Sequence, residues 1–185
     1  MKKIFIWWVQ WVWKSTITRL LTEKNSSLWR FSFWERMTDI DRTDIVDYNW
    51  FHLLSDHQRE DIVQKTRKQL VHLIDWENYT NLLFDNHFTI VRWNLIHNTF
   101  DDEEIIFYDK IVLLYSWIND IIQRILKDWK KERVELAKNY DFIKKHQELE
   151  ITRADFLSNK YSIEIIKILN NNLNNTLEQI EKFIY

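Results

Sequence analysis

Three residue types are absent from this chain of 185 residues: glycine, proline and cysteine. Without cysteine, the chain can form neither a disulfide nor a thiolate metal site. Without glycine, it lacks the residue that most easily takes the positive φ of tight turns and helix C-caps. An average chain of this length would hold about a dozen glycines. Their absence therefore makes a compact fold physically awkward.

Alanine is also scarce, since it occurs only at Ala137 and Ala154, whereas isoleucine, asparagine and lysine are abundant. Glycine, proline and alanine share codons rich in G and C, so their joint depletion indicates an AT-rich gene.

Two further features are missing: an excess of one charge and a long apolar run. The net charge of −2 and the pI near 6.3 give no general electrostatic footprint for nucleic acid. No apolar run reaches the roughly 18 residues of a membrane span. The apolar start resembles a short signal peptide but lacks a small-residue cleavage site and runs straight into a helical pattern. We therefore expect a single cytoplasmic domain over residues 1–185 with a sizeable core.

Tryptophan, in contrast, occurs 11 times. Four of these residues lie between positions 7 and 13, directly before Lys14-Ser15-Thr16. If each is read as glycine, residues 8–15 become G-V-Q-G-V-G-K-S, which is the G-x-x-x-x-G-K-[ST] phosphate loop. An apolar strand pattern over 3–6 precedes it and an amphipathic helix pattern over 14–24 follows, as this loop requires. Random placement of tryptophan would seldom produce that spacing.

Several other tryptophans occupy positions typical of glycine in turns or at helix ends, namely Trp34, Trp50, Trp76, Trp93 and Trp129. Our hypothesis is that tryptophan stands for glycine throughout, through a UGA codon that the translation table reads as tryptophan and the source reads as glycine. The alternatives are a naturally tryptophan-rich sequence and a deliberately altered one. As written, indoles in the loop would need strained φ and would fill the space of the phosphates.

Apolar runs alternate with helical patterns along the whole chain. This alternation predicts an α/β fold of the P-loop kinase type, with a five-stranded parallel sheet and helices on both faces. Strands are expected near 3–7, 28–33, 80–85, 109–115 and 161–168. Helices are expected over 14–24, 34–46, 56–75, 117–128, 132–157 and 174–184.

The expected ATP site is the loop and the start of its helix. It comprises Trp8, Val9, Gln10, Trp11, Val12, Trp13, Lys14, Ser15 and Thr16. Lys14 would place its charge on the β- and γ-phosphates, Ser15 would ligate the Mg²⁺ that accompanies ATP, and Thr16 would help to hold the α-phosphate. The alternative is a lysine at an ordinary helix start.

Asp85 ends the apolar strand 81–84, where a carboxylate beside the phosphate loop would orient Mg²⁺ or its waters. The alternative is an aspartate that caps a turn. His87 follows in D-N-H and could contact substrate, although a lone histidine is more often structural. In the basic segment 124–133, Arg124, Lys131 and Arg133 could neutralise the transferring phosphoryl group from a short lid near 127–134. The alternative is a solvated, charged helix face.

Taken together, these pieces resemble archaeal-type adenylate kinases, which are short-lid nucleoside monophosphate kinases. The resemblance spans most of the chain. It is carried by residues 8–21 read with glycine, FWERM at 33–37, LLFDNHFTI at 82–90, RILKDWKKER at 124–133 and HQELEITR at 146–153. Two departures are Lys131, where the family usually has arginine, and the segment 91–100, where the family has proline.

The resemblance implies transfer of the ATP γ-phosphoryl group to AMP, giving two ADP. It implies that Trp34, Asn86, His87 and Arg92 bind the acceptor, and that Asn170–Asn172 lie near the adenine of ATP. Other possibilities stay open: a kinase with another small acceptor, an ATP-binding module that transfers nothing, and a protein whose tryptophans are genuine and which has no phosphate site. The oligomeric state is left open.

The recoding hypothesis predicts the mass of the natural protein. Isolated from its source, the intact protein should be lighter than the printed sequence by eleven tryptophan-to-glycine differences. Intact-mass spectrometry measures this directly, and a mass equal to that of the printed sequence would contradict the hypothesis.

Overall fold

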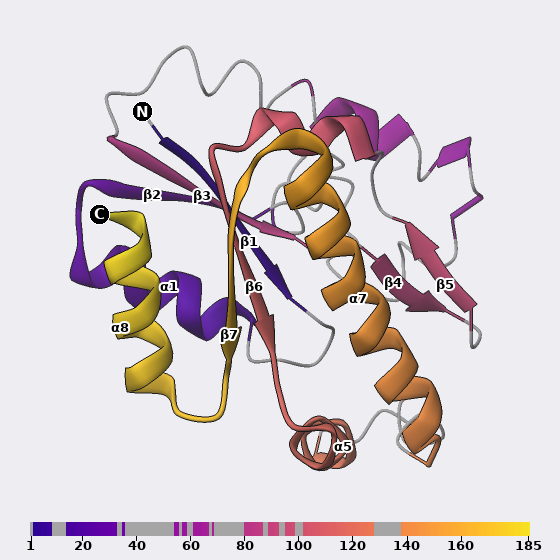
Figure 1. Cartoon of the computed structure of the whole chain (residues 1–185). Coiled ribbons are helices and arrows are strands. Elements are labelled where there is room, and N and C mark those ends of the chain that lie inside the picture. The colour runs from indigo at the N-terminus through magenta and orange to yellow at the C-terminus, as the bar shows by residue number, and fades with distance from the viewer. Residues whose placement is uncertain are drawn as a thin grey trace.

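A five-stranded parallel sheet lies at the centre of the molecule in the computed structural model (Figure 1). The strand order is β2-β3-β1-β6-β7. The strands are β1 (Lys2–Trp8), β2 (Leu28–Ser32), β3 (Asn81–Asn86), β6 (Lys110–Tyr115) and β7 (Glu164–Leu169). The structure describes residues 2–8, 14–32, 35, 54–55, 57–58, 61–66, 68, 80–86, 89–92, 95–98, 102–127 and 138–185.

The central strand β1 is buried on both faces, since the five residues from Ile4 to Trp8 are all 0% exposed. Continuous apolar runs of this kind are typical of parallel strands covered by helices on both sides. β1 pairs with β3 on one side, with Ile6 opposite Asp85, and with β6 on the other, with Ile6 opposite Val112.

Helices cover both faces of the sheet (Figure 1). The side chains of Ile4, Ile6 and Trp8 belong to the core shared with α1 (Lys14–Lys24) and α8 (Leu173–Ile184). The alternate residues Phe5 and Trp7 belong to the core shared with α7 (Tyr140–Tyr161) and the 3₁₀ helix η1 (Asp102–Phe107). This separation follows the two-residue period of a strand. A further helix, α5 (Ile118–Lys127), also contributes to the core that β1 shares with α1 and α8, here called the α1/α8 core.

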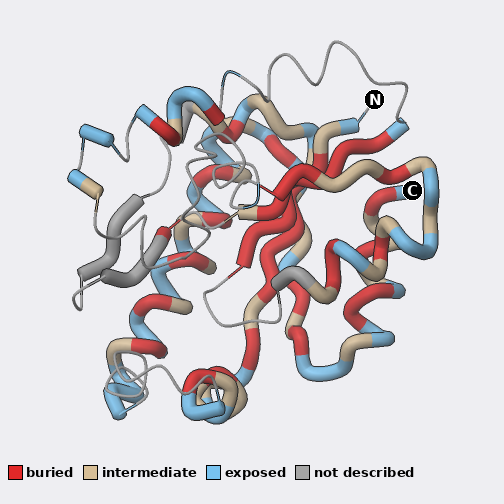
Figure 2. The backbone as a smooth tube through the Cα atoms, turned by 180° about the vertical axis from the view of Figure 1, so that it is seen from behind, coloured by how far each residue is buried: buried red, intermediate tan, exposed pale blue. Residues whose placement is uncertain are grey.

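Burial follows these layers. The strands of the central sheet form the buried interior in Figure 2, and the exposed residues lie on the outer faces of the helices. No helix in the described part of the chain is long and apolar enough to cross a membrane.

A small antiparallel hairpin follows β3 along the chain and was not predicted from the sequence. It consists of β4 (Thr89–Arg92) and β5 (Leu95–Asn98), with Thr89 opposite Asn98. It begins three residues after the end of β3, so it extends directly from the carboxyl edge of the sheet. The short alternating runs that form it are easily missed when a pattern search looks for longer elements.

The predicted α/β fold with its five parallel strands is confirmed, and so are most element positions. Helix 14–24 agrees with α1 at both ends, and each of the first four strands agrees within two residues. Of helix 56–75, the described residues 57–58, 61–66 and 68 are helical. Helix 34–46 lies outside the described residues except for the helical residue 35, and residues 128–137, which include most of the predicted lid, lie outside them.

The prediction was wrong at the junction between α7 and β7. The strand was expected from residue 161, but α7 continues through Tyr161, Ser162 ends it, and β7 begins at Glu164. Ser162 has φ 54° and ψ 37°, the left-handed conformation that glycine usually supplies at a helix C-terminus. Among the described residues, it is the one with positive φ.

Asparagine performs other capping tasks in this chain. The side chain of Asn139 accepts a hydrogen bond from the backbone N–H of Phe142 at the start of α7, and Asn172 accepts one from the N–H of Asn175 at the start of α8. These bonds satisfy donors that a helix N-terminus leaves unpaired. Asn25 accepts from the N–H of Ser27 in the turn after α1.

Replacing Ser162 by glycine should stabilise the protein. Glycine takes the left-handed conformation without the cost of about 1 kcal/mol that a Cβ imposes. We expect Ser162→Gly to raise the free energy of unfolding by up to about 1 kcal/mol in urea denaturation.

The matched control is Ser158→Gly, one turn earlier in α7. Ser158 lies within the helix, and its hydroxyl donates to the carbonyl oxygen of Ile163. This variant should lose about 1 kcal/mol or more. Equal effects of the two substitutions would contradict the assignment of strain to Ser162.

Candidate functional site

The candidate site is at the carboxyl edge of the sheet, where β1 and β3 end side by side. The ladder places Ile6 opposite Asp85 and Trp7 opposite Asn86. β1 ends at Trp8, and α1 begins at Lys14, so the predicted phosphate loop joins these two elements beside the end of β3. In open α/β sheets, ligands bind at this edge.

Asp85 is the central charged group of this edge and is only 1% exposed. Its Oδ2 accepts a hydrogen bond of 3.2 Å from the hydroxyl of Thr18, which lies on α1. The Nε of Arg30, on β2, is 3.8 Å from the same oxygen. A buried carboxylate needs such partners because desolvation of an isolated charge is costly.

Sequence reasoning missed Thr18 and Arg30. Arg30 also pairs with Glu35, so its guanidinium lies between two carboxylates. A signal for Thr18 was present, since it lies one helical turn after Ser15 and hence on the same side of α1. For Arg30, the signal was a charged residue within an otherwise apolar strand next to the strand that ends in Asp85.

The first turn of α1 borders an open cavity of about 440 Å³. Thr16 lines it together with Arg19, Thr22, Arg30 and Glu35. Thr16 is thus at a surface that a ligand could reach, as its predicted role requires. Lys14 and Ser15 are in the first turn of α1, and their side chains lie outside the described part of the structure.

Trp7 and Trp8 both lie in β1 rather than in a loop. The indole of Trp8 is fully buried in the α1/α8 core, so only its backbone could face a phosphate. The indole Nε1 of Trp7 donates to Glu150 Oε2 at 2.6 Å. Neither residue has positive φ. The backbone conformation at these two positions therefore does not require glycine. The hypothesis that tryptophan stands for glycine depends instead on the spacing of the phosphate-loop motif.

Several predicted site residues lie outside the described part of the chain. These are Val9, Gln10, Trp11, Val12, Trp13, Trp34, His87, Lys131 and Arg133. Arg92 is the last residue of β4, and the description there covers the backbone. Asn86 is the last residue of β3, next to Asp85, and is partly exposed.

Arg124 and Asn170, both predicted to lie near the nucleotide, are brought together. The Nη2 of Arg124, on α5, donates to the carbonyl oxygen of Asn170 at 3.3 Å. The hydroxyl of Ser116 donates to the same oxygen. Burial lowers the pKa of Arg124 from its usual value, and the negative charge of Asp120 opposes this shift. A cation thus borders the turn between β7 and α8.

A magnesium ion fits the chemistry of this edge as a companion of phosphates. Within the described residues, no three His, Cys, Asp or Glu side chains gather into a group that could hold a metal alone. Mg²⁺ is usually held by one or two protein oxygens together with substrate phosphates. Asp85 supplies a buried carboxylate of that kind, and Ser15 would supply a hydroxyl.

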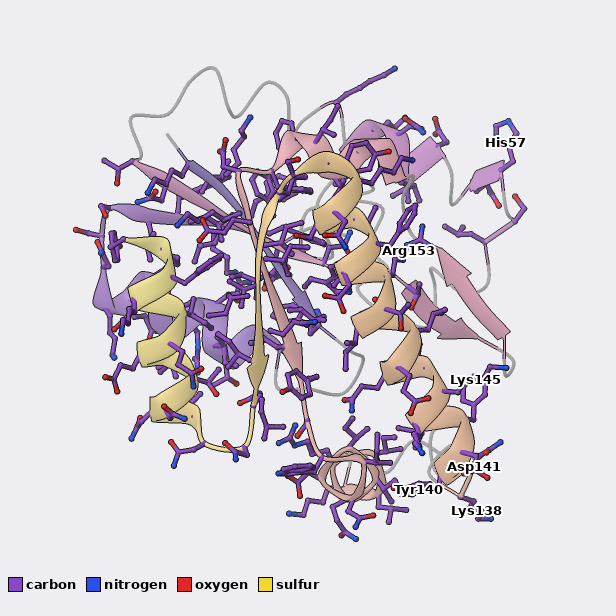
Figure 3. The ribbon with its side chains drawn as sticks, in the orientation of Figure 1. His57, Lys138, Tyr140, Asp141, Lys145 and Arg153 are labelled. Atoms are coloured by element: carbon purple, nitrogen blue, oxygen red, sulfur yellow. The ribbon has the colours of Figure 1, made fainter. Side chains whose placement is uncertain are left out.

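The two histidines whose side chains the structure describes, His57 and His146, lie in different environments. His57 is exposed and appears at the periphery, beyond the hairpin side of the molecule and away from the sheet (Figure 3). His146 is fully buried on α7. Glu150 is buried beside His146 and accepts the hydrogen bond from Trp7; neither feature was predicted from the sequence.

Comparison with known proteins supports the fold. No family model matches the chain, and no curated protein matches it in sequence. The crystal structure of a shikimate kinase from Bacteroides thetaiotaomicron is similar, with a TM-score of 0.60 and 15% identity over 99% of this chain and 98% of that one. A thymidylate kinase from Candida albicans is similar with a TM-score of 0.59 and 18% identity, over 99% and 90% of the two chains. At these identities the similarity establishes a P-loop kinase fold.

The Thr18–Asp85 bond can be tested by Thr18→Val, which removes the hydroxyl and keeps the shape. Because both residues are buried, Asp85 loses a donor that water cannot replace, and we expect a loss of about 1–3 kcal/mol in the free energy of unfolding at pH 7. Thr22→Val on the same helix is the control. Among the described residues, its hydroxyl donates to the backbone carbonyls of Thr18 and Arg19, so the loss should stay within about 0.5 kcal/mol. Equal losses would argue against a special role of the buried bond.

Proposed function

We propose that this protein is an adenylate kinase-like phosphotransferase that uses ATP and Mg²⁺ and converts ATP and AMP into two ADP. The observation that carries the proposal is the register of β1 with β3. It sets the buried carboxylate of Asp85 beside the strand end that enters the G-x-x-x-x-G-K-S pattern, once tryptophan is read as glycine.

Phosphoryl transfer requires little covalent chemistry from the protein, so positioning and charge neutralisation supply most of the catalysis. In the proposed site, backbone N–H groups of 8–13 surround the phosphates, and Lys14 contacts the β- and γ-phosphates. Thr16 helps to hold the α-phosphate at the open cavity. Ser15 and, through water, Asp85 would hold Mg²⁺, which would supply positive charge to offset that of the phosphates.

The acceptor side of the site is proposed to include Trp34, Asn86, His87 and Arg92. Arg124, Lys131 and Arg133 would add positive charge around the transferring group. In the structure, Arg124 donates to Asn170, so its guanidinium borders the segment proposed to hold the adenine of ATP. Through this contact, Arg124 would link the segment near the adenine to the lid.

A second candidate is transfer to another small acceptor. The two solved structures have almost equal TM-scores, 0.60 and 0.59, and their names point to different acceptors, shikimate and thymidylate. The fold therefore does not choose between a nucleotide and a metabolite hydroxyl. The resemblance of the D-N-H and HQE segments to archaeal-type adenylate kinases favours AMP.

The proposal can be tested by assaying two proteins side by side: the printed sequence and a version with glycine at all eleven tryptophan positions. ADP formation from ATP and Mg²⁺ is measured with and without AMP. We expect AMP-dependent turnover by the glycine version and none by the printed sequence, because indoles would fill the phosphate site. If the glycine version binds ATP and ignores AMP, the acceptor must be sought among other monophosphates and small hydroxyl compounds. ATP binding by neither protein would make the phosphate-loop interpretation wrong.

A matched pair of variants in the active version tests Asp85. Asp85→Asn keeps the shape but removes the charge that orients Mg²⁺, and we expect kcat to fall by about 10²-fold or more. Asp109→Asn is the control, because Asp109 is exposed and accepts from the N–H of Lys3 at the opposite, amino edge of the sheet. Its kcat should stay within about twofold of the parent. Equal rates for the two variants would remove Asp85 from the proposed mechanism.

A further inference from the structure

A fully buried polar cluster lies between α7 and the first residue of β4. His146 and Glu150, one helical turn apart on α7, are both 0% exposed, and so is Thr89. Figure 3 shows the course of α7, with Lys138, Tyr140 and Asp141 at its N-terminal end and Arg153 further along. The cluster lies on the part of the helix between these labels.

Glu150 is the centre of the cluster. Its Oε1 accepts hydrogen bonds from both the backbone N–H of Thr89, at 3.1 Å, and the hydroxyl of Thr89. Its Oε2 accepts from the indole of Trp7. One carboxylate therefore joins α7 to the end of β1 and to the start of β4.

His146 completes the cluster. Its Nε2 is 2.8 Å from the hydroxyl oxygen of Thr89 and 3.5 Å from Glu150 Oε1. A threonine hydroxyl has one proton, and here it is donated to Glu150. The Thr89 oxygen is then able to accept a hydrogen bond from an N–H at His146 Nε2.

The position of Thr89 gives the cluster its significance. At one end of the segment 86–88, Asp85 is held by the β1–β3 ladder and by Thr18. At the other end, Thr89 is held by Glu150. Only three residues separate these anchors, and they include Asn86 and His87, the D-N-H residues of the proposed acceptor side.

We propose that Glu150 and His146 are positioning residues for the acceptor side of the site, acting through Thr89 at the start of β4. This inference rests on the proposed function, which it deepens. It explains why His146 and Glu150 are buried on a helix face that is otherwise apolar. A buried charge is weak support for stability, and well-packed apolar residues often serve stability better.

The neighbouring contact of α7 is consistent with this role. Gln147 Oε1 accepts a hydrogen bond of 3.1 Å from the backbone N–H of Ser116, just past the end of β6. Consecutive residues of α7 thus hold the ends of different strands at the same edge of the sheet. Glu150 and His146 serve the acceptor side, and Gln147 serves the side where Arg124 and Asn170 meet.

The test uses Glu150→Gln and Thr89→Val in whichever version of the chain turns over. Glutamine keeps the shape but loses the charge that strengthens the bonds to Thr89, and its NH₂ group cannot accept from a donor. We expect the KM for AMP to rise about tenfold in Glu150→Gln and about threefold or more in Thr89→Val. The KM for ATP should change less than about twofold, because the proposed effect is on the acceptor side of the site.

The matched control is Glu148→Gln, on the same helix. The side chain of Glu148 is 63% exposed, and its Oε1 is 3.8 Å from Lys144 Nζ. Both KM values should stay within about twofold of the parent. The double variant Thr89→Val/Glu150→Gln should cost less than the product of the two single effects, because both act on one contact.

Amide hydrogen exchange at Thr89 gives a readout that does not depend on turnover. Glu150→Gln should speed exchange there, while Glu148→Gln should not. If Glu150→Gln speeds exchange at Thr89 but raises the KM values for AMP and ATP equally, the cluster is merely structural and the proposal is overturned. Unchanged exchange with unchanged KM values would also overturn it. If neither version transfers phosphoryl, the proposed function fails, and faster exchange would then identify a structural contact alone. Should Glu150→Gln fail to fold, Thr89→Val decides through the same comparison of KM values.

Discussion

The structure depends on the pairing of β1 with its two neighbours. This strand is buried on both faces and holds β3 and β6 in register along its length. Alternate side chains of β1 pack against different helices, Ile6 with the α1/α8 core and Phe5 with the core of α7 and η1. That register puts Asp85 level with Ile6 and brings the end of β3 beside the start of the predicted phosphate loop.

Two buried carboxylates stabilise the carboxyl edge in similar ways. Asp85 is held by a hydroxyl from α1 and a guanidinium from β2, and Glu150 by an indole from β1 and by Thr89. Each connects elements far apart in the sequence. Burying such charges costs free energy that their hydrogen bonds must offset. Their arrangement therefore favours a precisely held edge over maximal stability, as the proposed phosphoryl transfer would require.

The absence of glycine has different consequences in different places. At the end of α7, Ser162 adopts the left-handed conformation itself, and asparagine side chains cap α7 and α8. In β1, the indoles of Trp7 and Trp8 are accommodated in the core, and Trp7 even finds a partner in Glu150. If these positions are glycine in the natural protein, Glu150 loses that partner and keeps Thr89 and His146. The acceptor-side contact therefore does not depend on the identity of residue 7.

The sequence by itself determined the fold class, the positions of the first four strands and the candidate roles of Lys14, Ser15 and Asp85, since local periodicity and motif spacing contain this information. It did not indicate the hairpin after β3 or the extension of α7 to Tyr161, because short elements and helix ends depend on local competition that patterns resolve poorly. The partners of the buried charges came only from the tertiary structure. Glu150 lies 61 residues from Thr89 along the chain and 143 from Trp7. No local pattern records such a contact, because it forms only when packing brings α7 onto the sheet.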